Sequence, residues 1–128
     1  MSKTSFINVD LELSSYESLS SAVDELADRL VLLQNRFEDG EYFLSFECVF
    51  NGTDANSVIE EFLRLIDLLI PLAKEKLLNS HRKVLDIGYV SGEECVIKNV
   101  LAGANLAKVA MYGFDIYITV YPLDEAHV

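Results

Sequence analysis

The chain has 128 residues, a formal net charge of −11, and apolar residues at 51% of its positions. The apolar content excludes an intrinsically disordered chain, and the length predicts a single domain over residues 1–128. The excess of 21 acidic over 10 basic residues argues against a nucleic-acid-binding protein and against attraction to an anionic membrane surface.

The first half of the chain alternates between strand and helix patterns. Residues 6–14 alternate apolar and polar side chains, which predicts a strand with one apolar and one acidic face. Apolar residues then recur at steps of four and three from Leu19 to Phe37, which predicts a helix that starts near Ser14. The segment 38–41 should end this helix and turn the chain. Residues 42–50 alternate again and predict a second strand.

A second helix is expected from Ser57 to about Asn79. It is apolar over more than half of its circumference, so we expect it either at the centre of the core or covered by a partner. Pro71 lacks a backbone N–H donor and should kink or break this helix.

The remaining chain predicts a strand at 83–90, a helix of small residues from Val96 to Tyr112 ended by Gly113, and a strand at 114–121. The expected order is therefore β-α-β-α-β-α-β. Alternating strands favour a sheet with one covered and one wetter face. The predicted fold is an α+β two-layer sandwich with a four-stranded sheet and three helices. Three helices barely fit on one face of four strands, so either one helix crosses to the other face, or the second helix stacks outside the layer or in an oligomer contact.

The residues that carry chemistry are scattered. The two histidines and two cysteines lack the spacing of metal ligands, and the glycines lack the patterns of phosphate-binding or dinucleotide-binding loops. The sequence therefore predicts no cofactor, no metal site and no enzymatic activity. An acid–base pair formed by Asp86 and Asp115 on neighbouring strands is the alternative that would make this chain an enzyme.

The acidic residues are unevenly distributed. Residues 1–61 contain 13 acidic and 3 basic residues, whereas residues 62–128 contain 8 and 7. The excess either keeps the protein soluble or forms a docking surface for a basic protein. The favoured docking surface is the outward sheet face, with Asp10, Glu12, Glu47, Asp86, Asp115, Tyr117 and Tyr121. The second is the outer side of the first helix, with Glu38, Asp39 and Glu41.

A family resemblance rests on the C-terminal motifs. The strand Leu85-Asp86-Ile87-Gly88-Tyr89, the small-residue helix ending in Gly, and the final strand closing on Tyr121-Pro122 resemble small acidic bacterial immunity proteins. The resemblance covers residues 84–122 closely and the remainder only through element order. It implies a protein that neutralises a cognate toxin domain, as in contact-dependent growth inhibition or other polymorphic toxin systems. Such toxins are often nucleases and hence basic, but the family supplies no binding residues that transfer to this chain.

Two functional hypotheses follow. The first is a cytoplasmic immunity protein whose carboxylates occupy the positions of nucleic-acid phosphates on a toxin domain. The cytoplasm is expected because the N-terminus shows no apolar signal segment. The alternative is a homo-oligomeric small-ligand or scaffold domain without catalytic activity. It would form a homodimer through the apolar second helix and bury Leu65, Leu68 and Leu72.

Overall fold

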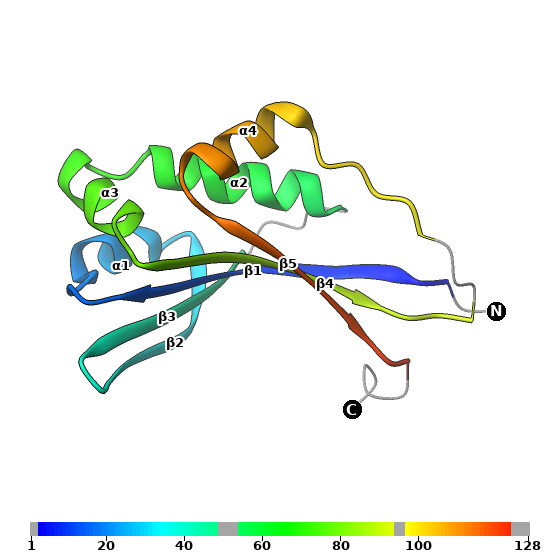
Figure 1. Cartoon of the computed structure of the whole chain (residues 1–128), viewed down its shortest axis with the longest axis horizontal. Coiled ribbons are helices and arrows are strands. Elements are labelled where there is room, and N and C mark those ends of the chain that lie inside the picture. Colours follow the sequence, from blue (N-terminus) through cyan, green and yellow to red (C-terminus); the bar gives the residue numbers. More distant parts are fainter. Residues whose placement is uncertain (1–2, 49–53, 94–96, 124–128) are drawn as a thin grey trace.

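The computed structural model describes residues 3–48, 54–93 and 97–123. Five strands form one sheet in the order β2-β3-β1-β4-β5, in which only β4 and β5 run parallel. Figure 1 shows the helices along one side of this sheet. The elements in chain order are β1 (Ser5–Ser15), α1 (Ser20–Leu26), β2 (Leu30–Glu38), β3 (Glu41–Cys48), α2 (Ala55–Asp67), α3 (Pro71–Leu78), β4 (Arg82–Val90), α4 (Gly103–Met111) and β5 (Asp115–Tyr121).

The core lies between the helices and the apolar face of the sheet. Val9 and Leu11 of β1 are fully buried, and the register places Leu11 beside Phe46 of β3 and Leu85 of β4. Phe62 of α2 is likewise fully buried in this cluster. Because side chains alternate along a strand, every second residue of β1, β3 and β4 points to the opposite face of the sheet. The helices do not cover this face, which we call the uncovered face (Figure 1).

The alternating segments formed strands as predicted. The strands expected at 6–14, 83–90 and 114–121 correspond to β1, β4 and β5 within one residue at each end. The strand expected at 42–50 corresponds to β3, although its last two residues lie outside the described part of the chain. Period-two alternation identified these four strands, because β1, β3 and β4 pack one face on the core and β5 follows the same alternation.

The predicted first helix is wrong over most of its length. Only Ser20–Leu26 is helical, and Leu30–Glu38 forms the edge strand β2. The backbone φ angles of Asp39 and Gly40 are +53° and +82°, which are typical of a tight hairpin turn joining β2 to β3. The pair Asp-Gly between apolar runs is itself a hairpin signal, so the expected end of a helix at 38–41 is wrong.

The predicted second helix is divided at the proline. Pro71 is the first residue of α3, where its missing N–H costs nothing, so the expected break is confirmed. The preceding helix α2 begins at Ala55, and its cap is Asp54, whose carboxylate accepts from the N–H of Ser57. The carboxylate of Glu25 accepts from the N–H of Ile70 at 3.1 Å and so ties α1 to the start of α3.

The predicted third helix starts later than expected. Within the described residues it runs from Gly103 to Met111, and residues 97–102 form an extended strap. Side chains hold this strap in place: Asn99 donates to the hydroxyl of Tyr89, and Asn56 accepts from the N–H of Ala102.

The predicted strand and helix counts and the predicted order therefore require correction. The protein is α+β, but it has a five-stranded mixed sheet and four helices in the order β-α-β-β-α-α-β-α-β. The additional strand, β2, widens the sheet, and the helices share one of its faces (Figure 1). Among the described residues, no helix is long and apolar enough to cross a membrane.

Candidate functional site

The uncovered face of the sheet collects carboxylates from three neighbouring strands. Asp10 on β1 is paired with Glu47 on β3 and with Asp86 on β4. Residues paired directly across a sheet point to the same face, so these three side chains lie in one row. Glu12 lies on the same face, two residues further along β1. We call these four residues the acidic cluster.

The last strand adds the remaining residues of the predicted sheet surface. Tyr117 is paired with Asp86, and Asp115 is paired with Val84. Residues two apart on a strand point to the same face, so Tyr121 shares the face of Asp115 and Tyr117. The structure thus brings all seven residues of the favoured docking surface to the uncovered face.

The carboxylates in the row repel one another. The pKa of Asp10 rises from 3.8 to about 6 because the side chain is half-buried and because Glu47, Glu12 and Asp86 are negatively charged. Burial is the largest cause. A cation placed on this row would remove the repulsion and favour the ionised form of Asp10.

The hydrogen-bond donors to this row are neutral. The amide of Asn8 donates to Glu47 at 3.2 Å and to Asp10 at 3.4 Å. The hydroxyl of Thr119 donates to Asp86 at 2.8 Å. Within the described residues, no cation bonds to Asp10, Glu47 or Asp86. Their negative charge is therefore available to a binding partner.

Two arginines and two aromatic rings border the acidic cluster. Arg82 bonds to Glu12 at 3.1 Å and lies over the ring of Tyr117. Arg36 of β2 lies 4.6 Å from the centre of the Phe43 ring. A shallow groove of about 530 Å³ runs between them; its lining includes Asp10, Glu12, Ser14, Gln34, Arg36, Phe43, Ser45 and Arg82. The groove is thus acidic along β1 and bordered by cationic and aromatic side chains.

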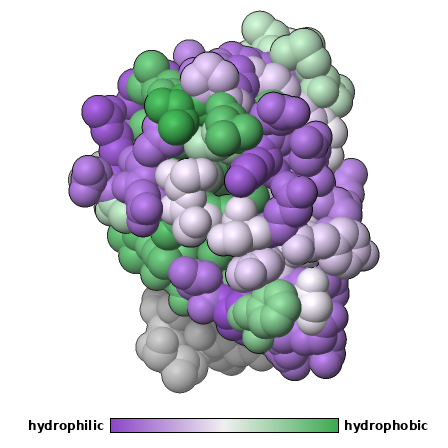
Figure 2. Space-filling model, turned by 90° about the vertical axis from the view of Figure 1, so that its left-hand side faces the viewer, coloured by the Kyte–Doolittle hydropathy of each residue, from purple (hydrophilic) through white to green (hydrophobic). Residues whose placement is uncertain are grey.

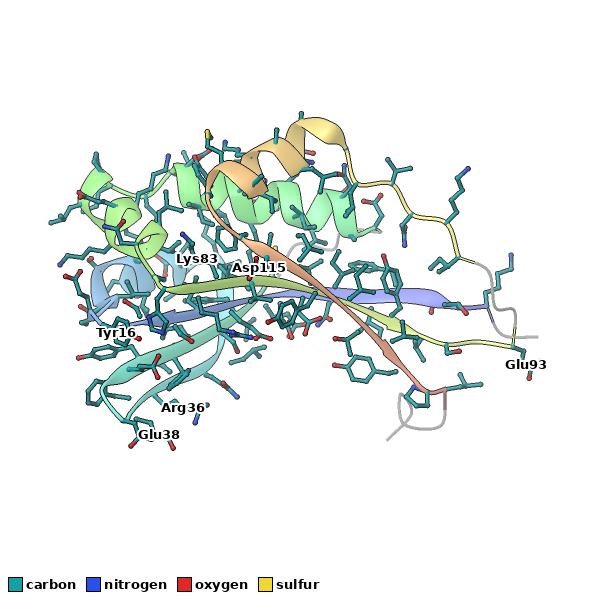
Figure 3. All side chains as sticks on the ribbon, viewed as in Figure 1. Tyr16, Arg36, Glu38, Lys83, Glu93 and Asp115 are labelled. Atoms are coloured by element: carbon teal, nitrogen blue, oxygen red, sulfur yellow. The ribbon has the colours of Figure 1, made fainter. Side chains whose placement is uncertain are left out.

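The second predicted surface does not exist as described. Glu38, Asp39 and Glu41 belong to the β2–β3 hairpin rather than to the end of a helix. Glu38 pairs with Arg36, and Glu41 pairs with His81 at 2.5 Å. Figure 3 shows Arg36 and Glu38 near the tip of the hairpin, well away from Asp115. These carboxylates do not join the acidic cluster.

The acid–base pair has little support in the geometry. Asp86 and Asp115 share a face, but the register offsets them by two residues on adjacent strands. Asp86 accepts from Thr119, and no hydrogen bond joins the two carboxylates in the described part of the chain. Nor do any histidine, cysteine, aspartate or glutamate side chains among the described residues gather closely enough to hold a metal ion.

The apolar second helix packs into the protein's own core. Leu65 is 4% exposed and buried against the other elements, which accounts for the breadth of the apolar surface of α2. Leu68 and Leu72 are exposed at the corner between α2 and α3. Figure 2 shows a hydrophobic patch on the end of the molecule that includes this corner, surrounded by hydrophilic atoms.

Several side chains of this face were not among the predicted binding residues. Asn8 and Thr119 hold the carboxylates in place, and Arg82 and Phe43 border the groove. Alternation does place Asn8 and Thr119 on the outward face with the predicted residues, but their bonds to carboxylates on neighbouring strands depend on the strand order. Phe43 falls in the strand expected at 42–50, but its neighbour Arg36 falls within the helix expected to run to Phe37, so the contact between them could not be foreseen.

Comparison with known proteins adds no relatives. The chain matches no protein-family model, no curated protein sequence and no solved structure.

Proposed function

We propose that this chain is an immunity protein that captures a basic toxin domain on the uncovered face of its sheet. The resemblance of residues 84–122 to small acidic immunity proteins supports this function. The acidic cluster supplies a surface with the charge that such a partner needs. Its place of action would be the cytoplasm, where a nuclease toxin would reach its substrate.

The single observation that carries the proposal is the negative charge of Asp10, Glu47 and Asp86, with which no cation in the described part of the chain pairs. Carboxylates that repel one another cost folding free energy, and surface carboxylates seldom stand in a row across adjacent strands because like charges placed opposite one another are destabilising. A lysine or arginine side chain from a partner would bond to them and release this repulsion. Tyr117 and Tyr121 border the row and add apolar contact area with few rotatable bonds.

The proposed mode of action is occlusion. A nuclease domain binds phosphates through lysine and arginine side chains. Carboxylates from three strands of this sheet would bind those lysine and arginine side chains and block access of the nucleic acid. Opposite charges on the two proteins would also accelerate their encounter.

The test uses the C-terminal domain of the protein encoded directly upstream of this chain as the candidate toxin. Binding of the purified proteins is measured by calorimetry at low ionic strength, with the wild-type chain and with Glu47→Lys. We expect a complex with the wild type and an affinity at least about tenfold lower with Glu47→Lys, since a charge reversal at a contact typically costs more than about 1.4 kcal/mol.

Glu75→Lys is the matched control. Glu75 is exposed on α3, in the helical layer away from the acidic cluster, and its reversal changes the net charge by the same amount. It should bind like the wild type. The absence of any complex would overturn the proposal, and equal losses from both variants would show that the uncovered face is not the docking surface.

A further inference from the structure

The outer edge of β5 carries backbone hydrogen-bonding groups with which no other described strand pairs. The N–H of Ser91 donates to the carbonyl of Tyr121 at 2.8 Å, so this carbonyl points toward β4. Backbone groups alternate along a strand, and the N–H and C=O of Ile116, Ile118 and Val120 therefore point away from β4. No described strand pairs with that side.

The two edges of the sheet differ in how they are protected. β2, at the opposite edge, has a bulge between Leu32 and Gln34 and carries the charged residues Arg36 and Glu38. Bulges and charges are features that prevent a strand edge from pairing with another chain. β5 has a regular register, and its only charged residue is Asp115, at its start. β5 is thus the edge that is open to pairing.

β5 also presents an exposed apolar row on the helical side of the sheet. Ile118 is 66% exposed and Val120 is 56% exposed. In the described part of the strap, Asn99 bonds to Tyr89, which is buried, whereas the β5 neighbour of Tyr89, Val120, stays exposed. Figure 1 shows that the far half of β5 extends beyond the helices.

We propose that β5 pairs antiparallel with β5 of a second copy of this chain, so that the two sheets become one. The two-fold axis passes through Ile118, which faces Ile118 of the second copy. Ile116 then faces Val120 of the second copy, and the three outward-pointing residues of each strand exchange backbone hydrogen bonds. Their side chains meet as one apolar layer on the helical side.

The residues on the uncovered face are compatible with the same register. Tyr117 faces Thr119 of the second copy, and Asp115 faces the hydroxyl-bearing Tyr121 of the second copy. No like charges lie opposite one another, a condition that favours a cross-strand pair. Centring on Ile118 is the register that pairs every residue from Asp115 to Tyr121. The contact is isologous and closes as a dimer, leaving only the two protected β2 edges.

The test is sedimentation velocity over a range of protein concentrations with the wild type, Ile118→Lys and Leu72→Lys. Ile118 is exposed, so a lysine there should leave the monomer folded, which circular dichroism checks. Leu72 is 59% exposed at the corner between α2 and α3 and is the matched control. We expect a concentration-dependent dimer for the wild type and Leu72→Lys, and a dissociation constant at least tenfold higher for Ile118→Lys.

Each other outcome contradicts the proposal. A wild type that is monomeric at every concentration would overturn it, as would a dimer that Ile118→Lys leaves unchanged. Dissociation by Leu72→Lys alone would place the contact at the α2–α3 corner instead. If Ile118→Lys does not fold, hydrogen exchange of the wild type tests whether β5 pairs with a second copy. Protection of the Ile118 amide that rises with protein concentration supports the pairing, and protection that stays constant rejects it.

Discussion

Asp10 is the residue whose chemistry the tertiary structure changes most clearly. As a side chain of an isolated strand it would be an ordinary exposed carboxylate. In the sheet it lies between Glu47 and Asp86 and is half-buried, and its pKa rises to about 6. Its ionised form is therefore destabilised in the folded protein relative to the unfolded chain.

This shift predicts how Asp10→Asn changes stability with pH. Because the folded pKa is raised, ionisation of Asp10 lowers stability as the pH rises from about 4 to about 6, and the loss then stays constant. Asp10→Asn removes the loss, so the variant should be more stable at pH 7.5 by about 1–2 kcal/mol after allowance for partial exposure. At pH 3.5 the two proteins should be equally stable. Urea denaturation at both pH values measures the difference.

Asp115→Asn serves as the control for this measurement. Asp115 is exposed on the same face, and its replacement removes the same charge. It should change stability by less than about 0.5 kcal/mol at either pH. An Asp10→Asn protein that is less stable than the wild type at pH 7.5 would show that the row of carboxylates is not strained.

At the scale of elements, the β2–β3 hairpin shows how a local signal decides between two structures. The apolar residues from Leu30 to Phe37 fit a helical spacing as well as an edge strand that is mostly exposed. The turn resolves the ambiguity, because Asp39 and Gly40 adopt left-handed backbone conformations that reverse the chain within two residues. Pairing with β3 then supplies the hydrogen bonds that a helix would have supplied internally.

Backbone conformation predicts opposite effects for alanine at Gly40 in the hairpin turn and at Gly103 at the start of α4. Gly40→Ala should lower stability by about 1 kcal/mol, because alanine strains a backbone with φ of +82° even though no atom lies within 4 Å of the added methyl group. Gly103→Ala also meets no atom within 4 Å and stands at the first position of α4 without a left-handed φ. It should raise stability by about 0.5 kcal/mol. Thermal unfolding of both variants is the measurement, and equal shifts would contradict the assignment of the turn.

At the scale of the whole molecule, the helices cover one face of the sheet, while the acidic cluster and the β5 edge remain accessible. The net charge of −11 affects these two surfaces in opposite ways. It would attract the proposed basic partner to the uncovered face, but it would oppose the approach of a second identical chain along β5.

The two associations should therefore respond oppositely to salt. Raising NaCl from about 20 to about 300 mM screens charge within a Debye length and should weaken capture of the basic partner by slowing association. The same change should strengthen the β5 dimer by reducing repulsion between like-charged chains. Binding kinetics and sedimentation across the salt series give the two signs. A dimer that dissociates on addition of salt would mean that charge pairs hold it, rather than the apolar row.

The candidate site could be predicted in part. Alternation alone identified the strand positions of Asp10, Glu12, Glu47 and Asp86, because the period of two fixes which residues share a face of one strand. It did not give the order of the strands, on which the repulsion depends. That order decides that Asp10 lies between Glu47 and Asp86, and that Arg82 neutralises Glu12.

The sequence by itself determined the α+β class, four of the strands, the break at Pro71 and the end of α4 at Gly113. These features depend on local periodicity and on the backbone conformations that proline restricts and glycine permits. The tertiary structure alone decided that residues 30–38 form a strand, that α2 is covered by its own chain, and which face and edge stay open. Those outcomes depend on contacts between residues distant in the sequence, whose energies exceed the small local preferences that a sequence pattern reflects.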